Sequence, residues 1–274
     1  MSLFLCPICA SPLTREERTY ACPNGHSFDL AKEGYVHLLP ANQKHSKAPG
    51  DDKAMVAARS RFLSAGYYGH LCAALQELSC RYAPAGEAVL VDSGCGEGYY
   101  TAGVAAALRE IGRTVRGAGV DISKFALRHA AKRDKSLEFA VGSAYRLPVM
   151  SDCAHLLLNC FSPMAPSEFH RVLQPNGVLF YVVPAPRHLW ELKEVLYRTP
   201  YENPDEAIPY EGFSPVEVVP VEKTVEIADH EDLMALFHMT PYTWNTPREG
   251  VERLEALPSL TVTASFRIHV FRRA

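Results

Sequence analysis

Four side chains near the start of the chain have the types and the spacing of metal ligands: Cys6, Cys9, Cys22 and His26. The two halves, C-x2-C and C-x3-H, can each turn back and give two ligands to one tetrahedral Zn²⁺. Four protein ligands leave no open position for a substrate water, so we predict a structural zinc. The alternative is a set of unrelated core thiols and an imidazole. About thirty residues bury too little apolar surface to fold unaided, so the metal should hold residues 1–35 together.

A second chemical group lies between residues 89 and 100, where an apolar run ends in Asp92 and is followed by Gly94, Gly96 and Gly98. A strand, a tight glycine turn and a helix start bring a ligand close to unpaired backbone N–H groups. The third glycine comes one residue too early for a dinucleotide fingerprint, and no P-loop Lys-Ser/Thr pair follows. Asp121 ends the next apolar run, and a carboxylate at that place can accept two hydroxyl hydrogen bonds at once. The alternative is a glycine turn in another kind of α/β enzyme.

The composition sets outer limits on the class of protein. A chain of 274 residues with 47% apolar residues allows one large domain, or one domain with a small appendage. No apolar run has the length of a membrane span, and the first residues lack the pattern of a signal peptide. We therefore expect a cytoplasmic protein without a membrane partner. In that compartment the eight cysteines indicate metal binding or core packing, not disulfides.

The charge is unevenly distributed, although the net value is only −3. Residues 32–61 hold six Lys/Arg against three acids, and residues 201–260 hold three against thirteen. Basic residues gather at Lys44-His45-Ser46-Lys47, Lys53, Arg59 and Arg61. This stretch is predicted to contact RNA phosphates. The alternative is a solvated linker that binds nothing.

The elements that must position these groups alternate as in a doubly wound α/β sheet. Strands are predicted near 88–92, 116–121, 137–141, 154–159 and 177–183, and helices near 99–110, 123–133, 166–173 and 187–198. Two alternating segments, 216–227 and 260–271, should close the sheet as an antiparallel pair. We divide the chain into a zinc knuckle (1–35), a basic linker with helices (36–84) and the sheet domain (85–274). The sheet domain should have its own core and stay folded without zinc.

Taken together, these features resemble a known family. The glycine loop resembles the first motif of class I S-adenosylmethionine (SAM) methyltransferases. The zinc spacing, the segment Asp29–Val36, the loop and Pro186-Arg187-His188-Leu189 follow in one order. This order is similar to that of the 23S rRNA guanine-N1 methyltransferases, which act on a loop of helix 35. The resemblance covers essentially the whole chain and implies a Rossmann-like methyltransferase fold with a small zinc domain.

The resemblance also implies site residues and a partner. Cys6, Cys9, Cys22 and His26 fall at its zinc positions, and Tyr68, Gly96, Glu97 and His188 fall at its SAM contacts. Together with Asp92, Gly94, Gly98 and Asp121 they form the expected cofactor set. The implied substrate is 23S rRNA, at guanine 745 or the nearby guanine 748. The segments Phe161–Pro163 and Glu168–Leu173 resemble the branch known from Gram-positive bacteria. Ser93 and Asn176-Gly177 depart from the usual pattern.

The implied reaction is an in-line transfer of the sulfonium methyl group to guanine N1, which must lose its proton. The sequence shows no clear base. Asn159, at the end of the fourth predicted strand, is the candidate catalytic residue, either orienting the base edge or merely capping the strand. His188 is expected to contact the cofactor or shuttle a proton, with a structural role as the alternative. Duplex pairing hides N1, so the guanine must be unpaired or flipped out.

Two other functions remain open at this point. One is a SAM enzyme acting on a small molecule or another RNA, with the zinc piece as a lid. The other is a zinc-knuckle RNA-binding protein whose cofactor loop is inactive, although the intact acids and glycines argue against it. The sequence leaves the oligomeric state open, with a homodimer as one alternative.

Overall fold

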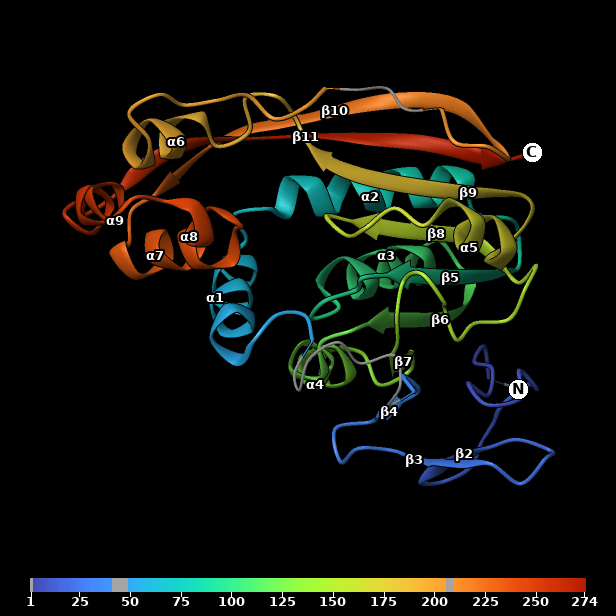
Figure 1. Cartoon of the computed structure of the whole chain (residues 1–274). Helices are drawn as coiled ribbons and strands as arrows, with labels where there is room; N and C mark the ends of the chain where they lie inside the picture. Colours follow the sequence, from blue (N-terminus) through green and yellow to red (C-terminus); the bar gives the residue numbers. More distant parts are fainter. Residues whose placement is uncertain (1, 41–48, 206–208) are drawn as a thin grey trace.

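The computed structural model describes residues 2–40, 49–205 and 209–274 (Figure 1). Across these residues, eight strands form one sheet in the order β10-β11-β9-β8-β5-β6-β7-β4. Its parallel centre contains β5 (Glu87–Ser93), β6 (Thr114–Asp121), β7 (Glu138–Val141), β8 (Ala154–Cys160) and β9 (Leu173–Pro184). The long antiparallel strands β10 (Phe213–Ile227) and β11 (Leu260–Arg273) close one edge, as predicted.

Three of the described helices begin at a residue whose side chain caps them. The side chains of Asp52, Ser123 and Asp229 each accept a backbone N–H of the first turn that follows. These caps start α1 (Lys53–Ser64), α4 (Lys124–Arg133) and α7 (His230–Met239). The other helices are α2 (Gly69–Tyr82), α3 (Tyr99–Glu110), α5 (Pro166–Val172), α6 (Trp190–Leu196), α8 (Tyr242–Asn245) and α9 (Arg248–Glu255).

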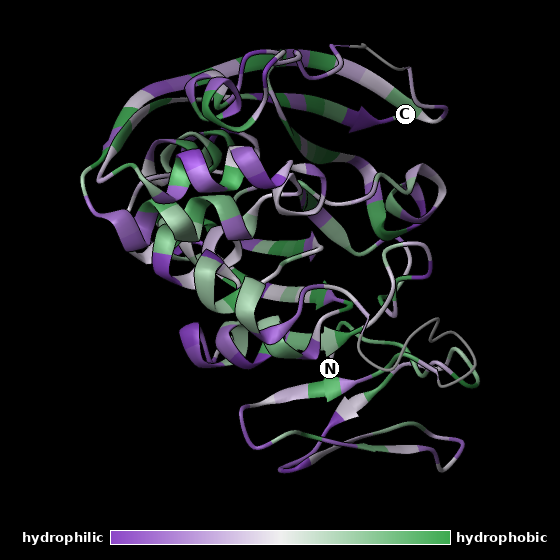
Figure 2. Cartoon of the chain, turned by 60° about the vertical axis from the view of Figure 1, so that its left-hand side comes forward, coloured by the Kyte–Doolittle hydropathy of each residue, from purple (hydrophilic) through white to green (hydrophobic). Residues whose placement is uncertain are grey.

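The strands divide their side chains between two buried clusters, because successive residues of a strand point to opposite faces. In β5, Leu90 belongs to one cluster and Val89 and Val91 to the other. The first cluster is covered by α1 to α4 with residues of α6, α7 and α9, and the second by α5 and the N-terminal segment. Figure 2 shows hydrophobic residues along the strands and mixed faces on the helices. The predicted doubly wound α/β fold is thereby confirmed.

The N-terminal segment forms a small ribbon of its own. Strands β1 (Thr14–Arg15), β2 (Thr19–Ala21) and β3 (Ser27–Asp29) make a three-stranded antiparallel sheet. The chain then enters the large sheet through β4 (Tyr35–His37), which pairs in parallel with β7. The predicted boundary at residue 35 therefore falls at the start of a strand of the large sheet. Three residues are too few to show a strand period, so sequence analysis missed β4.

The ribbon is joined closely to the sheet domain. The backbone N–H of Leu5 donates to the carbonyl of Pro148 (2.9 Å), and Glu138 of β7 accepts both the N–H of Leu3 (3.0 Å) and the hydroxyl of Tyr20 (2.8 Å). Leu3, Phe4 and Tyr20 are fully buried in the same cluster as residues of β5, β6 and β8. The sheet domain has a large core of its own on one face, and the ribbon supplies part of the cluster on the other face. That the domain stays folded without zinc is still only a prediction.

Candidate cofactor cavity and metal centre

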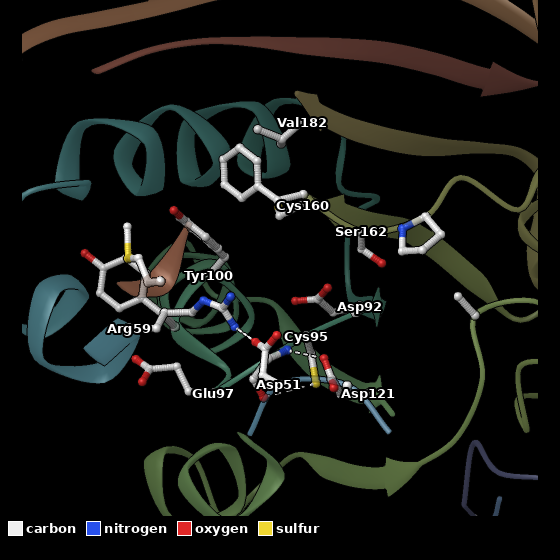
Figure 3. Close-up of a pocket in the computed structure, with 18 of the residues that line it drawn as sticks. Asp51, Arg59, Asp92, Cys95, Glu97, Tyr100, Asp121, Cys160, Ser162 and Val182 are labelled. Atoms are coloured by element: carbon white, nitrogen blue, oxygen red, sulfur yellow. Dashed lines mark hydrogen bonds and ion pairs between the residues drawn. The ribbon is translucent and has the colours of Figure 1, made fainter. Parts of the chain in front are cut away.

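A cavity of about 660 Å³ opens at the carboxyl ends of the parallel strands (Figure 3). This is where ligands of open α/β sheets bind. One wall comes from the glycine loop after β5 and from Asp121 to Ile122 after β6. Further walls come from Gly142 to Tyr145 after β7 and Phe161 to Pro163 after β8. Each of these segments follows a neighbouring strand, so the sheet order alone brings them together.

The three glycines of the loop all have positive φ, between +53° and +80°, but each is required for a different structural reason. A Cβ at Gly96 would meet no protein atom within 4 Å, so the space beside it is free for a ligand. A Cβ at Gly94 would collide with the side chain of Ser162. A Cβ at Gly98 would press on Ala130 of α4 at 3.1 Å. Gly98 does not line the cavity; it caps α3 and lets α3 and α4 pack, so the structure gives it a structural role and its contact with the cofactor is still only a prediction.

Two carboxylates face the loop from β5 and β6. Asp92 accepts a hydrogen bond from the Thr101 hydroxyl through Oδ2 (2.6 Å), while its buried Oδ1 has no partner among the described residues. Burial raises the pKa of Asp92 to about 7. Asp121 accepts the N–H of Gly96 (2.8 Å) and that of Ser123 (2.7 Å), and burial raises its pKa as well. Asp121 thus shapes the loop and retains lone pairs for a ligand.

A third acid and an ion pair complete this side of the cavity. Glu97 is 2% exposed and forms a salt bridge to Arg133 at 2.6 Å, while its Oε2 has no partner among the described residues. Arg59 of α1 pairs with Asp51, and both line the cavity near Asp121. Arg59 was predicted to contact RNA phosphates, because nothing in the local sequence shows that residues of α1 line this cavity.

The other half of the cavity is largely aromatic. Tyr68, Tyr100, Phe161, Tyr242 and Phe266 line it, and they come from widely separated parts of the chain. Tyr100 is 8% exposed, and its hydroxyl has no partner among the described residues. Burial raises the pKa of Tyr100 well above its usual range, so this hydroxyl stays protonated and can donate. Phe161 is 47% exposed and holds a positive φ of 55° at the tip after β8.

His188 lies against Tyr68 at the back of this aromatic half. Its Nδ1 accepts the N–H of Ser265 (3.2 Å), so the ring proton of the neutral imidazole lies on Nε2, which faces the Tyr68 oxygen at 3.4 Å. Burial lowers the pKa of His188 to about 3. A ring with this pKa and both nitrogens engaged is a poor proton shuttle. Its geometry fits an orienting role for the Tyr68 hydroxyl.

Asn159 does not line the cavity, contrary to the prediction that it orients a base edge. Its side chain is fully buried, and its amide nitrogen donates to the carbonyls of Ser93 (3.2 Å) and Pro163 (3.3 Å). The residue therefore ties the loop after β5 to the tip after β8. This is the capping alternative that the sequence had left open, and it makes Asn159 a positioning residue at most.

The metal centre lies in the ribbon, away from this cavity. The ligand atoms of Cys6, Cys9, Cys22 and His26 all lie within 4.8 Å of one another. Gly25 has a φ of +82° and makes the turn that lets His26 face Cys22, with Nδ1 and Sγ 3.3 Å apart. The Ser11 hydroxyl lowers the pKa of Cys9 to about 5, which favours the thiolate that binds metal. Three sulfurs and one imidazole at these distances fit tetrahedral Zn²⁺ with no open position.

Comparisons with known proteins decide between the readings of this geometry. A family model described as RlmA, N-terminal, matches residues 4–47, and a methyltransferase-domain model matches residues 90–177. The chain is 35% identical to the 23S rRNA (guanine(748)-N(1))-methyltransferase of Streptomyces fradiae, over 96% of this chain and 95% of that protein. The chain belongs to the family of 23S rRNA (guanine-N1)-methyltransferases. A Bacillus subtilis relative, YxjB, provisionally named for the same activity, is 32% identical over 97% of this chain and 96% of its own.

Two cofactors belong to this methyltransferase: SAM, and a structural zinc in the ribbon. The cavity fits SAM because it offers free space beside Gly96, an unpartnered buried carboxylate oxygen on Asp92 and a second carboxylate on Asp121. Of the residues predicted for SAM, all except Gly98 line this one cavity. SAM supplies an electrophilic methyl group, and the chain's residues hold and orient it.

The structure describes only part of the basic stretch that was predicted to contact RNA. Lys44, His45, Ser46 and Lys47 lie outside the described residues. Arg61 is paired with three carboxylates, those of Asp229, Glu231 and Asp232, at 2.5–3.0 Å, and so clamps α1 to α7. Within the described part of the chain, no helix is long and apolar enough to traverse a bilayer.

Proposed function

We propose that this enzyme transfers the methyl group of SAM to N1 of a guanine in the helix 35 loop of 23S rRNA, and that the guanine is number 748. The observation that carries the proposal is the 35% identity over nearly the full length to a relative named for guanine 748. The tip from Phe161 to Pro163, which is closer to the Gram-positive branch, supports the same choice and lines the cavity. Such an enzyme would act in the cytoplasm, where rRNA is made.

The cavity has the two halves that this reaction requires. The polar half, with Asp92, Gly96 and Asp121, would hold the cofactor, and the aromatic half would enclose a flipped base. In the transfer the N1 proton passes to solvent water, the N1 electron pair forms the bond to the methyl carbon, and the electrons of the sulfonium C–S bond return to sulfur, which leaves a neutral thioether. Negative charge develops on guanine O6 as that proton departs. The free Tyr100 hydroxyl is a buried donor in this half, and we assign it to O6.

Mass mapping of 23S rRNA tests the proposal directly. Rises in mass of one methyl group at guanine 748, lost in a deletion strain and restored by the gene, are the expected result. A methyl group at guanine 745 would place the enzyme in the other branch. Methylation of small metabolites or of another RNA, with 23S rRNA untouched, would establish the competing function.

The assembly of the enzyme can be measured at the same time. The homodimer is the alternative that we propose to test by sedimentation of the zinc-loaded protein with and without a helix 35 fragment. One protein chain per particle, both free and with the RNA fragment bound, excludes the dimer.

A further inference from the structure

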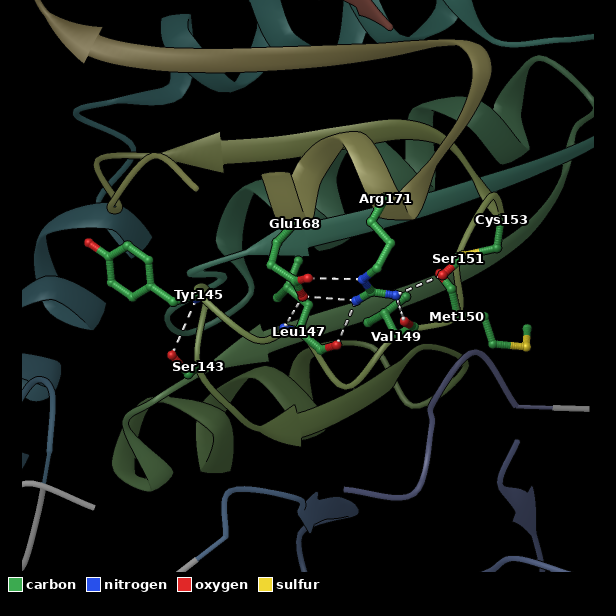
Figure 4. A network of polar contacts seen from close by, with 9 residues as sticks. All are labelled: Ser143, Tyr145, Leu147, Val149, Met150, Ser151, Cys153, Glu168 and Arg171. Atoms are coloured by element: carbon green, nitrogen blue, oxygen red, sulfur yellow. Dashed lines mark hydrogen bonds and ion pairs between the residues drawn. The ribbon is translucent and has the colours of Figure 1, made fainter. Parts of the chain in front are cut away.

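The loop after β7 connects the cavity to the zinc ribbon. Its first residues, Gly142 to Tyr145, line the cavity, and its later backbone bonds to the ribbon through Pro148 and Met150. Between these ends lies a tight turn, in which the N–H of Arg146 donates to the carbonyl of Ser143 (3.1 Å) and the N–H of Tyr145 to its hydroxyl (3.3 Å). In Figure 4 the Tyr145 ring points away from the polar network of Glu168 and Arg171.

The base of this turn is held by two charged residues of α5. Glu168 accepts the N–H of Leu147 (2.7 Å). Arg171 binds Glu168 and donates to the carbonyls of Leu147 (2.9 Å) and Val149 (2.8 Å) and to the Ser151 hydroxyl (3.1 Å). Hydrogen bonds to charged groups are among the stronger ones in proteins. The base of the turn is therefore fixed in place on the side of α5.

The tip carries an aromatic ring and a cation that the fold does not use. Tyr145 is 69% exposed although it lines the cavity, and its neighbour Arg146 is exposed with no ion pair among the described residues. Other exposed apolar side chains, such as Ile8 and Trp244, do not line the cavity, whereas Tyr145 and Phe161 do. An exposed ring beside a guanidinium without an ion pair is the pair of groups that stacks on an unpaired base and contacts its phosphate.

We infer that Tyr145 and Arg146 bind the single-stranded RNA next to the target. The ring stacks on the base that neighbours the flipped guanine, and Arg146 contacts the adjacent phosphate. This inference rests on the proposed function, because it needs an RNA substrate. A stacking ring at the opening of the cavity would also hold the RNA loop while its guanine enters.

The test variant is Tyr145→Ala, and two controls accompany it. Tyr145→Phe keeps the ring, and Trp244→Ala removes a similarly exposed ring that does not line the cavity. For Tyr145→Ala we expect the KM for a helix 35 fragment to rise about 5- to 100-fold while the Kd for SAM changes by less than about twofold. Tyr145→Phe and Trp244→Ala should behave like the wild type. In Arg146→Ala, the slope of log K against log salt should flatten by about 0.7 to 0.9, the value for one phosphate.

Three outcomes overturn the inference or separate it from the proposed function. An unchanged KM and salt slope refute the RNA contact. A parallel loss of SAM affinity in Tyr145→Ala assigns the ring to the cofactor and also refutes it. If the wild type does not methylate the fragment, the proposed function fails. Filter binding of the same RNA by Tyr145→Ala and Tyr145→Phe then decides the stacking contact by itself.

Discussion

In the metal centre every ligand atom faces another ligand, whereas several polar atoms of the cofactor cavity face nothing. The Sγ and Nδ1 atoms of the ribbon lie within 4.8 Å of one another, and Cys6 and Cys22 are buried. In the cavity, Asp92 Oδ1, Glu97 Oε2 and the Tyr100 hydroxyl are buried without partners among the described residues. An unpaired buried polar atom is costly, and a bound ligand can satisfy the three that belong to cavity-lining residues. Other unpartnered buried atoms, such as Asn159 Oδ1 and Ser93 Oγ, belong to residues outside the cavity lining.

This contrast between a closed and an open site predicts how each should respond to a substitution or to loss of its ligand. A closed site stabilises the fold, so its loss should lower the free energy of unfolding. An open site carries unsatisfied groups for a ligand that comes and goes, and its loss should appear in binding or turnover. The following experiments test this division, beginning with the largest effect.

Removal of zinc should destabilise the whole chain and not only residues 1–35, because the ribbon is buried in a cluster shared with the sheet. We expect the thermal midpoint to fall by roughly 10 °C or more on chelation or in Cys22→Ser. Calorimetry with zinc analysis measures this, and Cys80→Ser, outside the ribbon, is the matched control. A midpoint that stays in place while only the ribbon loosens would restore the separate-core view.

Gly96→Val should weaken SAM binding more than about 100-fold, since its side chain would occupy the free space beside the loop. The control is Gly112→Val, because Gly112 has a similar φ of +78° and equally open surroundings but lies after α3, outside the cavity. Calorimetric titration with SAM measures the affinities of both. Equal losses in the two variants would mean that backbone strain, not the ligand space, is responsible.

Tyr100→Phe should lower kcat about 100-fold, the scale of one lost donor to a developing oxyanion. The ring remains, and its hydroxyl has no partner among the described residues, so the fold should be unaffected. Single-turnover methylation at saturating SAM and RNA measures the step. A variant with normal turnover shows that the hydroxyl does not act on O6.

Asp121→Ala should weaken SAM binding by about 1–3 kcal/mol, the cost of losing hydrogen bonds to a charged group. Part of this loss comes from the loop, since Asp121 also accepts the N–H of Gly96. Asp134→Ala, which removes a carboxylate paired with Arg109 outside the cavity, is the control. If the two variants bind SAM equally well, Asp121 does not hold the ribose.

The affinity for SAM should depend on pH through Asp92, whose pKa is raised to about 7. Below that value the carboxyl group is protonated and cannot pair with the cationic part of the cofactor, so affinity should rise with pH. Between pH 6 and pH 8 we expect about a tenfold gain, accompanied by proton release on binding. Asp92→Asn, which still accepts from Thr101, should bind weakly and without this dependence. A pH-independent wild type contradicts the assignment.

The same shift has a sign for stability. The ordinary pKa of this carboxyl is 3.8, so between pH 4 and pH 7 the unfolded chain ionises while the folded one stays protonated. Asp92 therefore lowers the free energy of unfolding as pH rises through that window. Asp92→Asn should remove this contribution.

Local spacing made part of this molecule predictable. Short stretches of sequence were enough to predict the zinc ligands, the glycine loop with Asp92 and Asp121, and the long antiparallel pair of strands. The family resemblance supplied the predictions for Tyr68, Glu97 and His188. What could not be read depends on where distant segments meet. Asp51 and Arg59 reach the cavity only because α1 crosses over it, and Asn159 is turned away by two carbonyls. Tyr100 gave no signal, since an unpaired hydroxyl is visible only in three dimensions.

The pairing of β4 with β7 has a consequence for how the protein emerges from the ribosome. Tyr35 pairs with Phe139, so the first strand of the sheet is made about a hundred residues before its neighbour. At roughly 5–20 residues per second, the ribbon waits about 5–20 s for that neighbour. Such a long-range pairing is intrinsically slow to form. Early zinc capture would keep the waiting segment compact, so metal supply during translation should govern the yield of folded enzyme.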